Sequence, residues 1–301
     1  MTAIEMIDDF IDANVAKMVD LQRILTRIPA IAPDNGGVGE AEKGRALMEW
    51  LRGNGFPAIE ILNAPDNRVP GGGRPNIIVT VPGKGDEKRV WIMTHLDVVP
   101  PGEMKNWESD PYTLVEKNGK VFGRGVEDNQ QGLVASIFAA LSLVHNKTIP
   151  PQTVKLLFAA DEEVGSTFGI KYLLKEHALF KPEDVFLVPD GGSMDGSQLE
   201  IAEKGLLWLQ FRTIGRQCHA SKPGLGINAF TAGSELVVCL SRLGQIFNEK
   251  NDLVDPPFST FQPTKKEANV PNINTIPGED IFCLDCRILP SIPLERVIGE
   301  I

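Results

Sequence analysis

The sequence contains little cysteine and little histidine, with four residues of each among 301. The cysteines are irregularly spaced at Cys218, Cys239, Cys283 and Cys286. Cys283 and Cys286 lie three residues apart in an expected strand, so their side chains should point to opposite faces. This pattern argues against a disulfide framework or a zinc knuckle and favours buried free thiols.

Long apolar segments are also missing. No apolar run reaches the ~18–20 residues that span a bilayer, and residues 1–27 are typical of an acidic amphipathic helix instead of a signal peptide. Basic residues are outnumbered, because 30 Lys and Arg stand against 40 Asp and Glu and give a net charge of −10. We therefore expect a cytoplasmic protein that binds neither nucleic acid nor anionic membranes.

Helical and strand periods alternate along the chain, which predicts an α/β fold with helices over a mainly parallel sheet. We expect a first domain over residues 1–193 and a smaller α+β domain over residues 194–301, beginning near Met194. In the first domain we expect helices at 3–27, 40–53, 130–146 and 167–178, and strands at 57–62, 76–81, 89–95, 113–116, 153–160 and 184–189. In the second domain we expect strands at 206–214, 259–264 and 281–288, a helix at 227–247 and another from Pro293.

Acidic and imidazole side chains follow several of these strands. His95 and Asp97 lie two residues apart at one strand end, so both face the same space and the carboxylate can orient the imidazole. Asp128 precedes an apolar helical run, and Asp190 follows another strand. Residues 161–163, Asp-Glu-Glu, close a buried strand, where adjacent carboxylates repel one another unless a cation or a proton neutralises them. Together these strand ends predict a metal site, although His95 alone could be a solvated strand end and Asp128 a helix N-cap.

These segments resemble the zinc-dependent aminoacylases and metallopeptidases, the family of acetylornithine deacetylase, succinyl-diaminopimelate desuccinylase and the glutamate-releasing carboxypeptidases. The matching segments follow the family's order: 93–100, 107–111, 123–128 with Gly132, 161–166, 189–191, 203–205 and 219–228. The resemblance implies a zinc-exopeptidase-like catalytic domain in residues 1–193 and a lid and dimerisation domain in residues 194–301. It also implies two zinc ions, with cobalt or manganese as alternatives, and a set of metal ligands in which Asp128 is the bridge: His95, Asp128, Glu163 and Asp190.

The resemblance implies further roles in catalysis and substrate binding. Asp97 would orient the site, and Glu162 would be the general base that takes a proton from water and passes it to the leaving amine. His219 would stabilise the oxyanion, in this family usually from across a dimer. Asn274 and Arg287 would line the substrate cleft, where an arginine fork suits a carboxylate. The peptide bond between Asp128 and the next residue would be cis.

The sequence departs from the family's pattern in two places. The family usually has a lysine after the bridging aspartate, where this chain has Asn-Gln-Gln at residues 129–131. The family's last metal ligand is a histidine in a further C-terminal stretch, but no histidine follows His219 here. We therefore expect an incomplete catalytic domain, a lid truncated in its second helix, one metal short of a protein ligand and a tendency to self-associate.

These observations predict hydrolysis of an amide bond in a small, carboxylate-bearing N-acyl amino acid by a homodimer formed through the lid. A di- or tripeptidase or a carboxypeptidase of the same family is the alternative. A non-catalytic chain with weak metal binding is the alternative of another class. Simpler explanations also stand for single residues, since His219 could be a solvated loop residue and Arg287 could form an ion pair on a strand surface.

Overall fold

The structure is a computed structural model that describes residues 3–193 and 195–301. It divides into two compact units, residues 1–192 (unit 1) and 193–301 (unit 2). This division lies one residue from the domain boundary expected from the sequence. Met194, the expected start of the second domain, lies outside the described residues.

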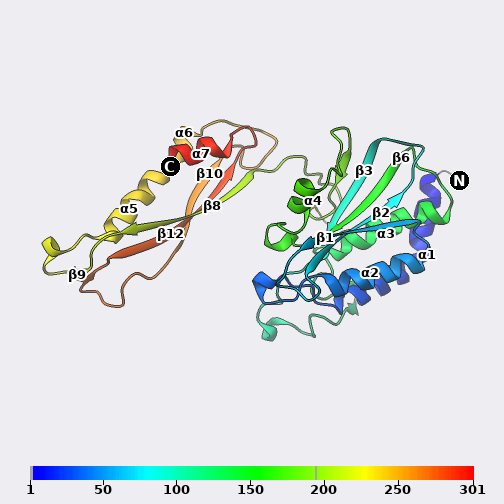
Figure 1. Cartoon of the computed structure of the whole chain (residues 1–301), viewed down its shortest axis with the longest axis horizontal. Coiled ribbons are helices and arrows are strands. Elements are labelled where there is room, and N and C mark those ends of the chain that lie inside the picture. The colour runs from blue at the N-terminus through cyan, green and yellow to red at the C-terminus, as the bar shows by residue number, and fades with distance from the viewer. Residues whose placement is uncertain (1–2, 194) are drawn as a thin grey trace. The chain divides into compact units, whose positions relative to one another are not determined.

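Unit 1 is built on a five-stranded mixed sheet with helices on both faces (Figure 1). Its strands, in spatial order, are β1 (Ala58–Pro65), β2 (Gly73–Val81), β6 (Gln152–Ala159), β3 (Gly85–His95) and β7 (Val185–Leu187).

The pairing of these strands corrects the prediction of a mainly parallel sheet. β2 pairs antiparallel with both β1 and β6, whereas β3 pairs parallel with β6 and β7. The chain turns directly back between β1 and β2, which favours an antiparallel pair. Crossovers that contain helices connect β3 to β6 and β6 to β7, as parallel pairing requires.

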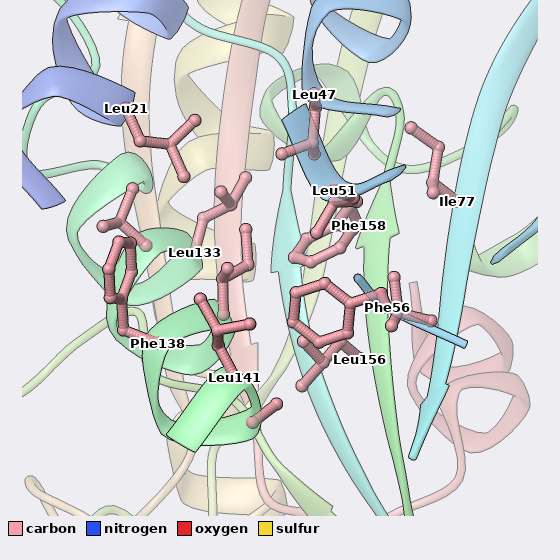
Figure 2. Packing of buried hydrophobic residues seen from close by; sticks show 14 of the residues in the cluster. Leu21, Leu47, Leu51, Phe56, Ile77, Leu133, Phe138, Leu141, Leu156 and Phe158 are labelled. Atoms are coloured by element: carbon pink, nitrogen blue, oxygen red, sulfur yellow. The ribbon is translucent and has the colours of Figure 1, made fainter. Parts of the chain in front are cut away.

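One face of this sheet is covered by α1 (Ala3–Thr26), α2 (Ala41–Gly53) and α3 (Gln130–His145). Leu21, Leu51 and Phe138 from these helices and Phe158 from β6 belong to one buried cluster (Figure 2). The largely apolar sequence of α3 is therefore explained by its position in the core of unit 1.

The other face of the sheet is covered by α4 (Ile170–Glu176). Leu173 of α4 shares a buried cluster with Trp91 of β3 and Leu157 of β6. Because successive strand residues point to opposite faces, Leu157 and its neighbour Phe158 belong to hydrophobic clusters on opposite faces of the sheet. Burial on both faces explains why the second half of β6, residues 156–159, is continuously apolar.

Shorter elements complete unit 1. A hairpin pairs β4 (Val115–Lys117) with β5 (Lys120–Phe122), and 3-10 turns form at η1 (Pro33–Asn35), η2 (Met104–Asn106) and η3 (Glu162–Val164). Among the described residues, no helix has both the length and the hydropathy to cross a membrane.

Unit 2 contains a three-stranded antiparallel sheet in the order β10 (Thr260–Lys266), β12 (Glu279–Ile288) and β8 (Gly205–Ile214). One face packs against helices, with Phe282, Leu284 and Cys286 of β12 in the core. The helices are α5 (Ala229–Leu240), α6 (Leu243–Ile246) and α7 (Leu294–Glu300), so the single helix expected at 227–247 is interrupted. A smaller ribbon pairs β9 (Cys218–His219) with β11 (Thr275–Ile276), next to the 3-10 turn η4 (Pro223–Leu225).

The cysteines are all free, as the sequence predicted. Only Cys286 is buried, however, and Cys239 on α5 is exposed. The expectation that these thiols are buried is therefore wrong for Cys239, since α5 covers its sheet with one side only.

Candidate active site

His95 and Asp97 form a buried pair where β3 ends. The His95 side chain is 2% exposed, and its Nδ1 atom lies 3.4 Å from the Asp97 carboxylate and 3.1 Å from the Asp97 carbonyl oxygen. Burial opposes protonation of the imidazole, but the hydrogen bond to Asp97 and the nearby acidic charges outweigh it and raise the pKa of His95 to about 9. This arrangement directs the Nε2 atom away from Asp97.

Two carboxylates from distant segments converge on that Nε2 atom. Asp128 Oδ1 lies 2.9 Å from it and Asp190 Oδ2 lies 3.7 Å from it. One ligand atom from each of these three residues lies within 4.8 Å of the other two. The structure thus brings together three of the predicted metal ligands.

Asn129 supports this cluster and was not singled out from the sequence as a site residue. Its amide Nδ2 donates to Asp190 Oδ1 at 2.8 Å and to the Pro189 carbonyl at 3.0 Å. The peptide bond between Asp128 and Asn129 is cis, as the resemblance implied. The only sequence signal for Asn129 was its position directly after the predicted bridging aspartate.

The acid triplet after β6 does have a cation beside it, as its repulsion requires, because Asp161 pairs with an arginine. Asp161 is buried and lies 3.1 Å from Arg74, which also pairs with Glu40. The other Asp161 oxygen accepts a hydrogen bond from the Phe168 amide at 3.0 Å. Asp161 has a φ angle of 67°, a left-handed conformation that turns the chain into η3. Repulsion within the triplet is therefore relieved partly by Arg74.

Glu162 and Glu163, the other two acids, lie in the 3-10 turn η3. Their backbone amides donate to the two oxygens of Asp97, each at 3.0 Å, so Asp97 connects the end of β3 to this turn. Burial raises the pKa of Glu162, and the charge of Asp190 adds to the effect. Burial and the charge of Asp128 raise the pKa of Glu163 to about 7. Glu163 does not belong to the group formed by His95, Asp128 and Asp190.

A buried lysine, Lys43 on α2, interacts electrostatically with Asp97. Lys43 is 1% exposed, and burial lowers its pKa to about 8 although the charges of Asp97 and Glu40 favour its protonated form. Glu40 and Lys43 thus belong to a charged network that reaches Asp97. Sequence reasoning missed them, because a Glu and a Lys on an amphipathic helix are usually solvent-facing.

In unit 2 the structure brings His219 and Asn274 together through the pairing of β9 with β11. The His219 Nε2 and Asn274 Nδ2 atoms are 3.4 Å apart. Both residues are exposed. Arg287 lies elsewhere on the unit, on β12, where its guanidinium pairs with Asp285 at 3.0 Å. That contact is the surface ion pair considered as the simpler explanation for Arg287.

The chemistry of the cluster in unit 1 suits a zinc ion. Zinc in proteins takes imidazole nitrogen and carboxylate oxygen ligands, and catalytic zinc keeps a coordination position open for water or substrate. His95, Asp128 and Asp190 offer one such nitrogen and two such oxygens. The bonds of Asp97 to His95 and of Asn129 to Asp190 are the kind of outer contacts that orient metal ligands.

Comparisons with known proteins agree with this geometry. Residues 91–275 match the profile of a family described as Peptidase family M20/M25/M40. An uncharacterized metallohydrolase of Methanocaldococcus jannaschii is 38% identical over 294 residues, which cover 94% of this chain and 71% of the relative. A succinyl-diaminopimelate desuccinylase of Nautilia profundicola is 28% identical over 266 residues, which cover 87% of this chain and 66% of the relative.

Solved structures match as well. The M20 family metallo-carboxypeptidase Sso-CP2 from Sulfolobus solfataricus has a TM-score of 0.71 and 20% identity, over 94% of this chain and 73% of that chain. A likeness at this identity concerns the fold, and it confirms the predicted α/β class.

Proposed function

The chain belongs to peptidase family M20/M25/M40 and is a metallohydrolase, and we propose that it hydrolyses the amide bond of a small N-acyl amino acid, as a deacetylase or desuccinylase does. The observation that carries this proposal is the convergence of His95, Asp128 and Asp190 beside Glu162. The similarity to succinyl-diaminopimelate desuccinylases supports the choice of substrate class.

The proposed site would hold two zinc ions, which cobalt or manganese could replace. His95, Asp128, Glu163 and Asp190 would be the ligands, with Asp128 shared. Bound zinc supplies a Lewis acid that polarises a carbonyl and acidifies water. Burial raises the pKa of Glu163, and the charge of Asp128 adds to the effect. This repulsion by Asp128 supports a place for Glu163 beside the same cations, because a cation would relieve it.

Glu162 is proposed to move the proton. A general base works best when its pKa is close to the working pH, and the raised pKa of Glu162 brings it nearer to neutrality. It would accept a proton from the attacking water and deliver it to the nitrogen of the leaving amine. Asp97 would keep the imidazole of His95 in place through this cycle, which its contacts to His95 and to η3 support.

His219 and Asn274 are proposed to stabilise the charge that develops on the substrate's carbonyl oxygen. Their contact with each other supports a shared role. Arg287 would bind the substrate carboxylate, for which it would have to exchange its present partner, Asp285.

A di- or tripeptidase or a carboxypeptidase is the second candidate, because the family description names peptidases. Both candidate functions use the same residues. They differ only in the substrate, which is an N-acyl amino acid in the first and a short peptide in the second. We also propose that the protein is cytoplasmic and forms a homodimer through unit 2.

An activity screen with zinc tests the proposal. The panel contains N-succinyl and N-acetyl amino acids, matched free dipeptides and tripeptides, and peptides with a C-terminal glutamate. Faster hydrolysis of the N-acyl amino acids is expected, and Glu162→Gln serves as the control for contaminating activity. Preference for free peptides would favour the second candidate, and equal rates for wild type and Glu162→Gln across the panel would contradict both.

A further inference from the structure

Asn129 precedes α3 in the position from which an asparagine usually caps a helix. A capping asparagine accepts hydrogen bonds from amides of the first helical turn through its side-chain oxygen. Asn228 does so at the start of α5, where it accepts from the amides of Phe230 and Thr231. Asn129 makes no such bond, and its buried Oδ1 atom has no hydrogen-bond partner within the described residues. The side chain of Asn129 therefore forgoes capping in favour of another contact.

That contact is made by the nitrogen end of the same amide. Asn129 Nδ2 donates to Asp190 Oδ1 at 2.8 Å and to the Pro189 carbonyl at 3.0 Å. A carboxylate and a carbonyl can only accept, so these partners fix the orientation of the amide and use both of its donor positions. Among the residues that the structure describes, no other hydrogen bond reaches residues 189 and 190 from outside their own segment. Asn129 is therefore the polar anchor of this segment.

Gly132, in the first turn of α3, allows the two segments to approach this closely. A Cβ atom at residue 132 would lie 2.0 Å from the Pro189 carbonyl oxygen and 3.3 Å from Asn129 Nδ2. Only glycine fits against a backbone oxygen at this distance. The segment that carries Asp190 is thus held against the start of α3 by close packing at Gly132 and by the two hydrogen bonds of Asn129.

We propose that Asn129 is a positioning residue that decides which oxygen of Asp190 is offered to a metal ion. Because the Asn129 amide occupies Oδ1, Oδ2 is the oxygen left to bind, and it lies 3.7 Å from His95 Nε2. Hydrogen bonds of this kind orient carboxylate ligands. The inference rests on the proposed function for the metal site, but the contact between Asn129 and Asp190 exists in the metal-free protein and can be tested there.

Zinc affinity, measured by competition with a chromophoric chelator, is the first test. Asn129→Leu keeps roughly the size of the side chain but donates no hydrogen bond, so it should weaken zinc binding about tenfold or more. Asn228→Leu, the matched control, removes an asparagine that caps a helix of unit 2 and should bind zinc as the wild type does. The cobalt-loaded Asn129→Leu protein should also show a changed visible absorption band, because this band reports the number and arrangement of the ligands.

NMR of the metal-free protein, with the nitrogen isotope introduced at asparagine, is a test that is independent of zinc. Asn129→Asp lacks the side-chain amide and therefore assigns the Nδ2 signals of Asn129. Asp190→Ala should shift these signals and leave those of Asn228 unchanged. The Asp190 side chain is 32% exposed, so its removal should leave the fold intact.

Either measurement can overturn the inference. Zinc affinity and a cobalt spectrum of Asn129→Leu equal to those of the wild type would do so, and so would Asn129 signals that Asp190→Ala does not shift. If the wild type binds no zinc, the proposed function fails, and the NMR result alone decides whether Asn129 orients Asp190. The NMR result also decides if Asn129→Leu does not fold.

Discussion

Glu162 and Glu163 are neighbours on one 3-10 turn, yet we propose that Glu162 is the general base and Glu163 a metal ligand. Glu162→Gln should lower kcat by about 10²–10⁴-fold and leave bound zinc almost unchanged, because it removes a proton acceptor and not a ligand. Glu163→Gln should lose zinc, since it removes a ligand charge. Zinc content by elemental analysis and kcat from the same samples check both statements. Equal zinc loss in the two variants would show that the roles are assigned wrongly.

Protons should compete with zinc for His95. In the metal-free protein, the pKa of His95 is raised to about 9 and that of Glu163 to about 7. When the pH is below the pKa of one of these groups, zinc must displace a proton from that group in order to bind. Zinc affinity should therefore increase with pH, by about tenfold per pH unit between 7 and 8 and more steeply below 7. Competition with a chromophoric chelator measures this dependence.

Asp97→Asn is the control for that titration. The hydrogen bond and charge of Asp97 are the main factors that raise the pKa of His95, so the variant should bind zinc with a weaker dependence on pH. An affinity that is independent of pH in the wild type would contradict the account of His95.

At the scale of elements, the junction of β6 and η3 depends on one buried arginine. Arg74 on β2 is fully buried and pairs with Glu40 and Asp161, which lie on segments before and after it in the chain. Arg74→Met should reduce the free energy of unfolding by about 3–5 kcal/mol, because two buried carboxylates lose their counter-charge. Chemical denaturation measures the change.

Arg23→Met is a matched comparison, since Arg23 forms exposed ion pairs with Asp20 and Glu116. Its loss should cost no more than about 1 kcal/mol. If the two variants were destabilised equally, the buried network around Arg74 would not support the turn as we describe.

Most helices and strands could be predicted from the sequence, because the spacing of apolar residues along the chain is a local property. The strands ending at His95 and Ala159 and the helix after Asp128 were placed within a few residues. The direction of strand pairing could not be predicted in the same way, since β2 and β6 meet only through the tertiary fold.

The details of the site show the same limit. The sequence could indicate an acid triplet, but not that Asp161 turns toward Arg74 while Glu162 and Glu163 bind Asp97 through their amides. Nor could it indicate that Asn129 supports Asp190, a residue 61 positions away. Contacts between distant segments decide these roles, and no local pattern encodes them.

At the scale of the whole molecule, unit 2 offers a strand edge for association. β8 is at the edge of its sheet, and within the described residues no strand pairs with its outer side. Trp208 and Ile214 on this strand are 69% and 76% exposed. Exposed apolar edge strands promote pairing with another chain, so we expect a dimer in which β8 takes part.

Ile214→Lys should shift that dimer toward monomer, because it places a charge on the edge strand. Leu253→Lys, at a loop residue of the same unit that is 61% exposed, should not. Light scattering over a concentration series measures both. A monomeric wild type, or an unchanged mass for Ile214→Lys, would contradict the predicted use of β8.

The central claim is that His95, Asp128 and Asp190 are parts of one metal site, with Asp128 shared between the ions. Equilibrium dialysis against buffered zinc, followed by elemental analysis, tests it on wild type and Asp128→Asn. We predict that the wild type retains zinc and that Asp128→Asn, which removes the shared charge but keeps the size of the side chain, loses more of it than any other single ligand substitution. No zinc on the wild type, or equal zinc on both proteins, would contradict the account.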